Sequence, residues 1–216
     1  MDVCFFMTLI NGNYREYKLD NGLVVALQST PTQTISAKLR VNYGTSHEQS
    51  GEEGMAHFLE HCVDDAGGEK FDALATDEIR SLFGYSNAST SIGRTFYIGQ
   101  MLSEDLKMWL DYTTDHVFKP RFDQKRVNEE RQRVLREISD YKSQPRYADH
   151  LGLVEAFYRG HPKGIQVLGK EEVVVGADLD NLVSFHGRGY HPNNMDLILV
   201  GSLPKDVEKI VGDYFS

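Results

Sequence analysis

The chain has 216 residues, of which 40% are hydrophobic and 25% are charged, and it carries a formal net charge of −9. This composition is ordinary for a globular protein with a sizeable core. The negative charge argues against a general attraction to nucleic-acid phosphates or anionic lipid headgroups. No stretch of the sequence approaches the roughly 20 apolar residues that cross a bilayer. Neither nucleic acid nor a membrane is therefore expected as a partner.

The two cysteines, Cys4 and Cys62, do not make a disulfide framework, and a chain of this length does not need one to fold. We therefore expect a reducing compartment, the cytoplasm. The apolar run at residues 3–10 is short and lacks the basic flank of a signal peptide, which favours a strand or packing arm. No linker or low-complexity tract marks a boundary, so one domain spanning residues 1–216 is the simplest expectation.

The first third of the chain predicts β-structure. Residues 14–19 and 23–28 flank the pair Asn21-Gly22, and an Asn-Gly pair between two such runs is a strong hairpin signal. Residues 35–43 alternate apolar and polar positions, which indicates a strand with one buried face.

The remaining chain combines helical patterns with three more strands. Strands are expected at residues 86–91, 94–101 and 195–200. Helices are expected at residues 52–66, 72–83, 103–118, 123–142, 147–158, 179–188 and 204–215. Strands paired with later helices predict an α+β domain of two layers.

The most informative residues lie on the helix expected from residue 52. Residues four apart project from one face of a helix, so His57 and His61 can offer two imidazole nitrogens to one ion. Zinc suits this arrangement, because catalytic zinc sites use three protein ligands and keep one position open for water. Glu60 lies on the same face, where its carboxylate can accept a proton from that water.

The helix expected at residues 123–142 supplies carboxylates for a third ligand. Glu130 and Glu137 are two helical turns apart and share a face. One of them can bind the metal while the other orients a ligand histidine, and the spacing alone does not say which does which. Glu129 is instead predicted on a solvated face, in ion pairs with Arg133 and Arg136.

The order His57-x-x-Glu60-His61 reverses the commoner HExxH motif and is typical of inverzincins. With its surroundings, the chain resembles the pitrilysin and insulinase (M16) family of zinc metallopeptidases. A short motif alone is weak, but the resemblance covers nearly the whole chain as an ordered series. Beyond the opening hairpin, it rests on residues 54–61, 86–90, 130–138, 190–195 and 200–201.

The resemblance implies the LuxS/M16-like metallopeptidase fold, an α+β domain with a mainly antiparallel sheet packed against helices. It implies Glu137 as the third ligand to one Zn²⁺ per chain and Glu130 as the support of the site. Asn87 and Ala88 match the family's edge strand, to which an extended peptide adds. The activity implied is that of a zinc-dependent endopeptidase that hydrolyses short or unfolded peptides, with Glu60 as general base.

The resemblance also implies a partner. Family members usually contain two or four such domains, so this chain corresponds to half of a two-domain subunit. We expect a second homologous domain or subunit, of the same or another polypeptide, to complete the chamber. Inactive family domains contribute an arginine and a tyrosine that steady the substrate carbonyl, and this pair has no assignable counterpart here.

One alternative and one departure from the family pattern accompany this interpretation. The chain could be a non-catalytic assembly or substrate-presenting subunit, but the complete set of ligands and base favours the enzyme. Residues 62–68, CVDDAGG, depart from the apolar stretch and Gly-Thr that the family usually has here. The acids Asp64 and Asp65 could change the shape of the loop or favour cationic substrates.

Overall fold

The computed structural model describes residues 13–161, 164 and 166–215. The expected strand or packing arm at residues 3–10 lies outside the described residues. The helices are α1 (Met55–Asp65), α2 (Ala73–Arg80), α3 (Leu106–Phe118), α4 (Gln124–Ser143), α5 (Tyr147–Tyr158), α6 (Glu171–Gly176), α7 (Leu179–Gly189) and α8 (Val207–Phe215). In this part of the chain, no helix has the length and apolar character needed to span a lipid bilayer.

One six-stranded sheet runs through the molecule in the order β1-β2-β6-β3-β5-β4. Its strands are β1 (Tyr14–Lys18), β2 (Val24–Ser29), β3 (Thr34–Val41), β4 (Tyr85–Thr90), β5 (Thr95–Leu102) and β6 (Met195–Gly201). All neighbouring strands are antiparallel except β2 and β6, which run parallel. The expected mainly antiparallel sheet is therefore confirmed, and β6 adds one parallel pair by inserting between β2 and β3.

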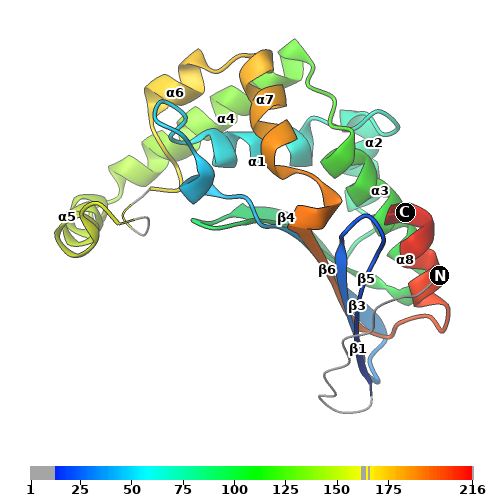
Figure 1. The fold of residues 1–216 in the computed structure, drawn as a ribbon. Helices are drawn as coiled ribbons and strands as arrows, with labels where there is room; N and C mark the ends of the chain where they lie inside the picture. Colours follow the sequence, from blue (N-terminus) through cyan, green and yellow to red (C-terminus); the bar gives the residue numbers. More distant parts are fainter. Residues whose placement is uncertain (1–12, 162–163, 165, 216) are drawn as a thin grey trace.

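The sheet buries one face. Every second residue of β3 from Ile35 to Val41 is buried, as the alternation of the sequence predicted. Figure 1 shows α1, α3 and α8 on this side of the sheet, and the fully buried Trp109 of α3 belongs to the core between the two layers. The opposite face carries polar pairs such as Arg40 and Asp196, whose Nη2 and Oδ2 atoms are 2.7 Å apart. The α+β two-layer fold class is confirmed.

The Asn-Gly hairpin forms as predicted. β1 and β2 pair from Tyr14 opposite Gln28 to Lys18 opposite Val24. Gly22 adopts a left-handed φ of 96°, which glycine tolerates without steric cost. The Oδ1 atom of the preceding Asn21 accepts a hydrogen bond at 3.1 Å from the N–H of Leu23, the residue just before β2.

The predicted helices exist, but their starts differ. α1 begins at Met55 rather than at residue 52, because Gly54 has a φ of 110°. The helix expected from residue 103 begins with a short 3-10 turn, Ser103–Asp105, before α3. The sequence pattern did not predict α6, since six residues are too few to show helical periodicity.

Candidate metal centre

α1 carries the motif, and its N-terminus is fixed by a partly buried carboxylate. The Glu48 side chain accepts hydrogen bonds from the N–H groups of Gly54 at 3.0 Å and Ala56 at 2.9 Å. These donors have no partner within the helix itself. Phe58 and Leu59 of α1 are fully buried in the core. Because α1 is capped and packed in this way, its polar residues have fixed positions.

The two histidines of α1 face each other. The Nε2 atoms of His57 and His61 are 3.3 Å apart, and the ring planes are nearly perpendicular. His57 is only 6% exposed. Two nitrogens bound tetrahedrally to zinc, each at about 2.0–2.1 Å, would stand about 3.3 Å apart. The observed separation matches that requirement.

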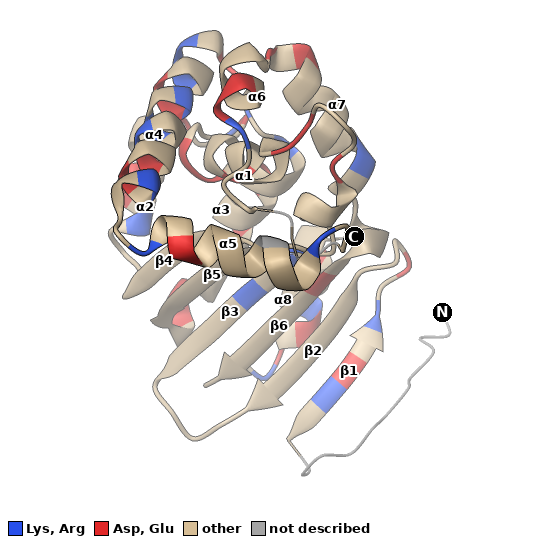
Figure 2. Ribbon diagram, turned by 90° about the vertical axis from the view of Figure 1, so that its left-hand side faces the viewer, with Lys and Arg blue, Asp and Glu red and all other residues tan. Residues whose placement is uncertain are grey.

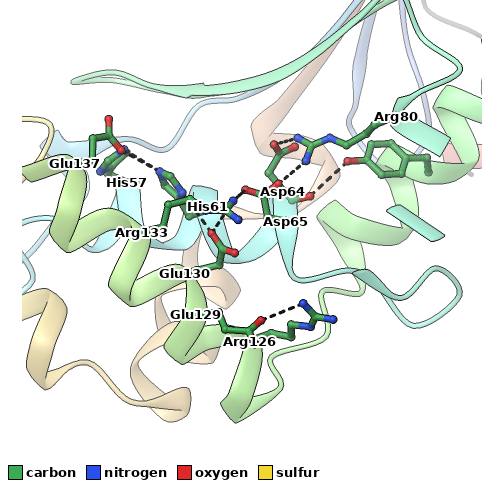
Figure 3. Close-up of polar contacts among 11 residues, drawn as sticks. His57, His61, Asp64, Asp65, Arg80, Arg126, Glu129, Glu130, Arg133 and Glu137 are labelled. Carbon is green, nitrogen blue, oxygen red and sulfur yellow. Dashed lines mark hydrogen bonds and ion pairs between the residues drawn. The ribbon is translucent and has the colours of Figure 1, made fainter. Parts of the chain in front are cut away.

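α4 brings a carboxylate to the same point. The Glu137 Oε2 atom lies 3.4 Å from Nε2 of His61 and 3.6 Å from Nε2 of His57. The buried residues Val127 and Val134 pack α4 into the core. Figure 3 shows this carboxylate approaching the two imidazole rings from the neighbouring helix.

The three side chains fit a zinc ion. One ligand atom each from His57, His61 and Glu137 lies within 4.8 Å of the other two. Two imidazole nitrogens with one carboxylate oxygen are a ligand set of catalytic zinc, which keeps a fourth position for water. The structure thus brings together the residues that the sequence singled out.

The surroundings separate the proton affinities of the two histidines. Burial and the adjacent His61 lower the pKa of His57 to about 4. Burial opposes the charge of His61 as well, but contacts with Glu130 and Glu137 outweigh it and raise the pKa of His61 to about 10. The same contact with His61 lowers the pKa of Glu137. Near neutral pH, the metal-free pair therefore carries a single positive charge, on His61.

Glu60 is a buried carboxyl group that lines a cavity together with His57 and His61. Burial raises its pKa to about 7, against a smaller opposing effect of Thr90. Its Oε2 atom has no hydrogen-bond partner among the described residues. A carboxyl group with a pKa near neutrality can both accept and return a proton.

Glu130 lies behind His61. Its Oε2 atom is 3.6 Å from Nδ1 of His61, on the side of the ring opposite the nitrogen that faces His57. The side chain is buried, and Arg133 places its Nη1 atom 3.2 Å from the same oxygen. A carboxylate in this position orients a ligand histidine and fixes its tautomer.

A cavity of about 900 Å³ opens beside these groups. The walls include Asn87 and Ala88 of β4, an edge strand that, among the described residues, pairs with β5 alone. Asn87 is exposed and donates to the Tyr85 hydroxyl at 2.9 Å. An extended chain laid along this edge would pass the histidines.

The opposite wall was not predicted. It is formed by one face of α5, with Tyr147, Leu151, Val154 and Tyr158 bordering the cavity. Their spacing of four, three and four residues indicates a single helical face. Nothing in the sequence distinguished a face that borders a cavity from one that joins the core. Figure 2 shows α5 crossing in front of the β4 end of the sheet.

The charge pairs of α4 differ from the sequence interpretation. Glu129 pairs with Arg126, whose Nη1 atom is 3.0 Å from Oε2, whereas Arg133 contacts Glu130 and Asp65. The expected solvated position of Glu129 is confirmed, but the expected partners Arg133 and Arg136 are wrong: among the described residues, Glu129 pairs with Lys125 and Arg126. Figure 2 shows acidic and basic residues interleaved along α4.

Fold and site together define an α+β domain with an HxxEH motif whose side chains could hold a metal ion. The family model described as insulinase (peptidase family M16) matches residues 24–171. The chain therefore belongs to this family.

Comparisons with individual proteins agree with this family membership. The chain is 29% identical to an uncharacterised zinc protease of Bacillus subtilis, YmxG, over 93% of this chain and 50% of that protein. It is 28% identical to the mitochondrial-processing peptidase subunit beta of Lentinula edodes, over 92% of this chain and 43% of that protein. The first half of the periplasmic protease PqqL from Escherichia coli shares the fold with a TM-score of 0.88 at 21% identity, over 95% of this chain and 46% of that one. The chain spans about half the length of the curated relatives it matches.

Proposed function

We propose that residues 1–216 form the catalytic domain of a zinc-dependent endopeptidase. The observation that carries this proposal is the convergence of two imidazoles and a carboxylate beside a buried carboxyl group of raised pKa. A structural zinc site would need a fourth protein ligand and no base. The family membership and the relatives named zinc proteases support the same activity.

In this proposal, each site residue has a separate role in hydrolysis. His57, His61 and Glu137 hold one Zn²⁺, and Glu130 orients His61 from behind. When bound, zinc supplies Lewis acidity toward a scissile carbonyl and lowers the pKa of a water molecule. Glu60 accepts a proton from the attacking water and delivers it to the leaving amine.

The substrate is a short or unfolded peptide that binds as an added strand. In the part of the chain that the structure describes, one edge of β4 is unpaired next to the histidines, and main-chain hydrogen bonds to such an edge do not depend on sequence. Asn87 and Ala88 lie on this strand at the cavity. A folded protein cannot supply an extended segment without unfolding locally.

A second homologous domain completes the chamber in this proposal. The chain covers about half of each of its first curated relatives, and the centre is open to a cavity on one side. The second domain belongs either to the same polypeptide or to another subunit. Its contribution is to close the cavity over the bound peptide.

The test compares Glu60→Gln with the parent chain and with Glu129→Gln, an exposed glutamate that lies outside the cavity. Each protein is loaded with zinc and incubated with a mixture of unstructured peptides, and products are identified by mass spectrometry. Removing a general base lowers proton-transfer catalysis by about 10²–10⁴-fold. We expect that loss in Glu60→Gln, with one zinc retained per chain, and none in Glu129→Gln.

The measurement is repeated on any complex that the chain forms with itself or with a co-purifying subunit. Equal cleavage by Glu60→Gln and the parent would contradict the role of Glu60. Failure of the zinc-loaded parent to cleave any peptide, alone and in its complexes, would contradict the enzyme and favour an assembly subunit.

A further inference from the structure

The last turn of α1 holds two aspartates next to the metal centre. Asp64 and Asp65 follow His61 by three and four residues, so they share its side of the helix. Both carboxylates contact the guanidinium group of Arg80, which projects from α2. The side chains of Asp64 and Arg80 are only 12% and 18% exposed. An enclosed ion pair of this kind holds its partners in one arrangement, because separating them would leave a buried charge unpaired.

The contacts continue from Asp65 toward the metal ligands. Its second oxygen lies 2.5 Å from Nη1 of Arg133 on α4. That same nitrogen is 3.2 Å from Oε2 of Glu130, and Oε2 is 3.6 Å from Nδ1 of His61. Figure 3 shows an unbroken line of charged groups from Arg80 to the histidine, through three helices.

These linked charged groups are suited neither to binding a second metal ion nor to contacting the substrate. Ligand atoms of His61, Asp65 and Glu130 do lie within 4.8 Å of one another. However, guanidinium groups from Arg80 and Arg133 already occupy and neutralise the carboxylates. Asp64 and Asp65 are absent from the described wall of the cavity, so they are badly placed to attract a cationic substrate.

We propose that Asp65 and Arg133, anchored by Arg80, are positioning residues that fix the Glu130 carboxylate against His61 and thereby set zinc affinity. Arg133 is 52% exposed, and a free arginine at such a position would sample many rotamers. Asp65 contacts the Nη1 atom of Arg133, and the same Nη1 atom contacts the Glu130 carboxylate. The contact with Asp65 therefore keeps the arginine in the rotamer that reaches Glu130. The inference rests on the proposed zinc site.

The chain offers a matched control on the same helix. Arg126 pairs with Glu129 three residues later, as Arg133 pairs with Glu130 three residues earlier, but the Arg126 pair is exposed on both sides. Changing either arginine to methionine removes one charge and keeps most of the apolar stem. Only Arg133→Met interrupts the line to His61.

The experiment measures zinc dissociation constants by competition with a chelating indicator, and thermal midpoints of the metal-free proteins. Loss of a group behind a metal ligand typically weakens metal binding by 10–100-fold. We expect a loss of at least tenfold in Arg133→Met and in Asp65→Asn, and less than twofold in Arg126→Met. Because Asp65 and Arg133 act through the same contact with Glu130, the double variant Asp65→Asn/Arg133→Met should have the zinc affinity of Arg133→Met alone.

A purely structural role predicts a different pattern. In that case Arg133→Met would lower the thermal midpoint of the metal-free protein without a separate effect on the zinc dissociation constant. Arg133→Lys would then restore the thermal midpoint and the zinc affinity together. We expect Arg133→Lys to restore only part of the affinity, because an ammonium group lacks the planar fork of donors. Unchanged affinity in Arg133→Met, or equal losses in Arg126→Met, would overturn the inference. If the parent binds zinc no more tightly than a Glu137→Gln variant, the proposed site itself fails.

Discussion

His57 and His61 occupy adjacent turns of one helix, yet they have pKa values of about 4 and about 10. The difference comes from their neighbours: His57 faces a second imidazole in a buried position, whereas His61 lies between two carboxylates. A metal that binds both must displace the proton that His61 holds. The carboxylates that stabilise this proton are Glu137, which would bind the metal, and Glu130, which would orient the metal-bound His61.

A third histidine makes stability depend on pH. His116 is buried, and burial lowers its pKa to about 4. Its Nδ1 donates to the carbonyl oxygen of Tyr112 at 2.9 Å, and its Nε2 lies 2.8 Å from the Thr76 hydroxyl. The folded pKa lies below the unfolded value near 6.5, so the unfolded chain takes up this proton first as the pH falls. This contribution to stability is complete above pH 6.5 and is lost toward pH 4.

We therefore expect the free energy of unfolding to lose about 2 kcal/mol from this group between pH 7 and pH 4.5. Asp64 acts in the opposite direction, because burial raises its pKa to about 6. The measurement is therefore a difference: urea unfolding of His116→Gln and of the parent at both pH values. The variant should lose about 2 kcal/mol less than the parent. Parallel losses would show that this histidine does not titrate between the two states.

At the scale of elements, the candidate site depends on how α1, α4 and α6 are held together. Arg131 of α4 donates to the carbonyl oxygens of Val174, Val175 and Ala177 at the end of α6. Its guanidinium group also lies over the Phe58 ring of α1, 5.2 Å from the centroid. One side chain thus joins three helices and satisfies carbonyls that the end of a helix leaves unpaired.

Replacing this arginine should destabilise the domain. Hydrogen bonds from charged donors contribute about 1.5–3 kcal/mol, so Arg131→Met is expected to lower the free energy of unfolding by about 2 kcal/mol. Urea titration measures this change, with Arg126→Met as the control because Arg126 makes an exposed pair on the same helix. The midpoint should fall without a change in slope. Equal midpoints for the two variants would mean that α6 is held by other contacts.

The elements that the sequence predicted are those whose signals are local. The hairpin has its Asn-Gly turn, β3 its alternation, and α4 its long apolar stripe. The short α6 and the parallel pairing of β2 with β6 depend on contacts between segments far apart in the chain, which no local pattern encodes. The two-histidine motif was likewise local, whereas the choice between Glu130 and Glu137 needed the resemblance to a family. The contact of Asp65 with Arg133 depends on helix packing, so the sequence assigned that arginine to Glu129 instead.

For the whole molecule, the metal would join segments that are distant in sequence. His57 and His61 belong to α1, while Glu137 belongs to α4, and both helices pack on the same core. A ligand that binds only the folded chain stabilises it by mass action, about 4 kcal/mol at a concentration 1,000 times its dissociation constant. For a domain of this size, 1 kcal/mol moves the thermal midpoint by roughly 2–4 °C.

Zinc at that concentration should therefore raise the thermal midpoint by about 10 °C, and a chelator should reverse the increase. Glu137→Gln should lose most of the increase, since it removes one ligand from a half-exposed position without opening the core. Glu129→Gln, on the same helix but away from the cavity, should keep it. Calorimetry of the three proteins with and without zinc makes the comparison. An equal increase in the parent and in Glu137→Gln would place the stabilising metal elsewhere, because a metal that joins α1 to α4 at this site requires the Glu137 carboxylate.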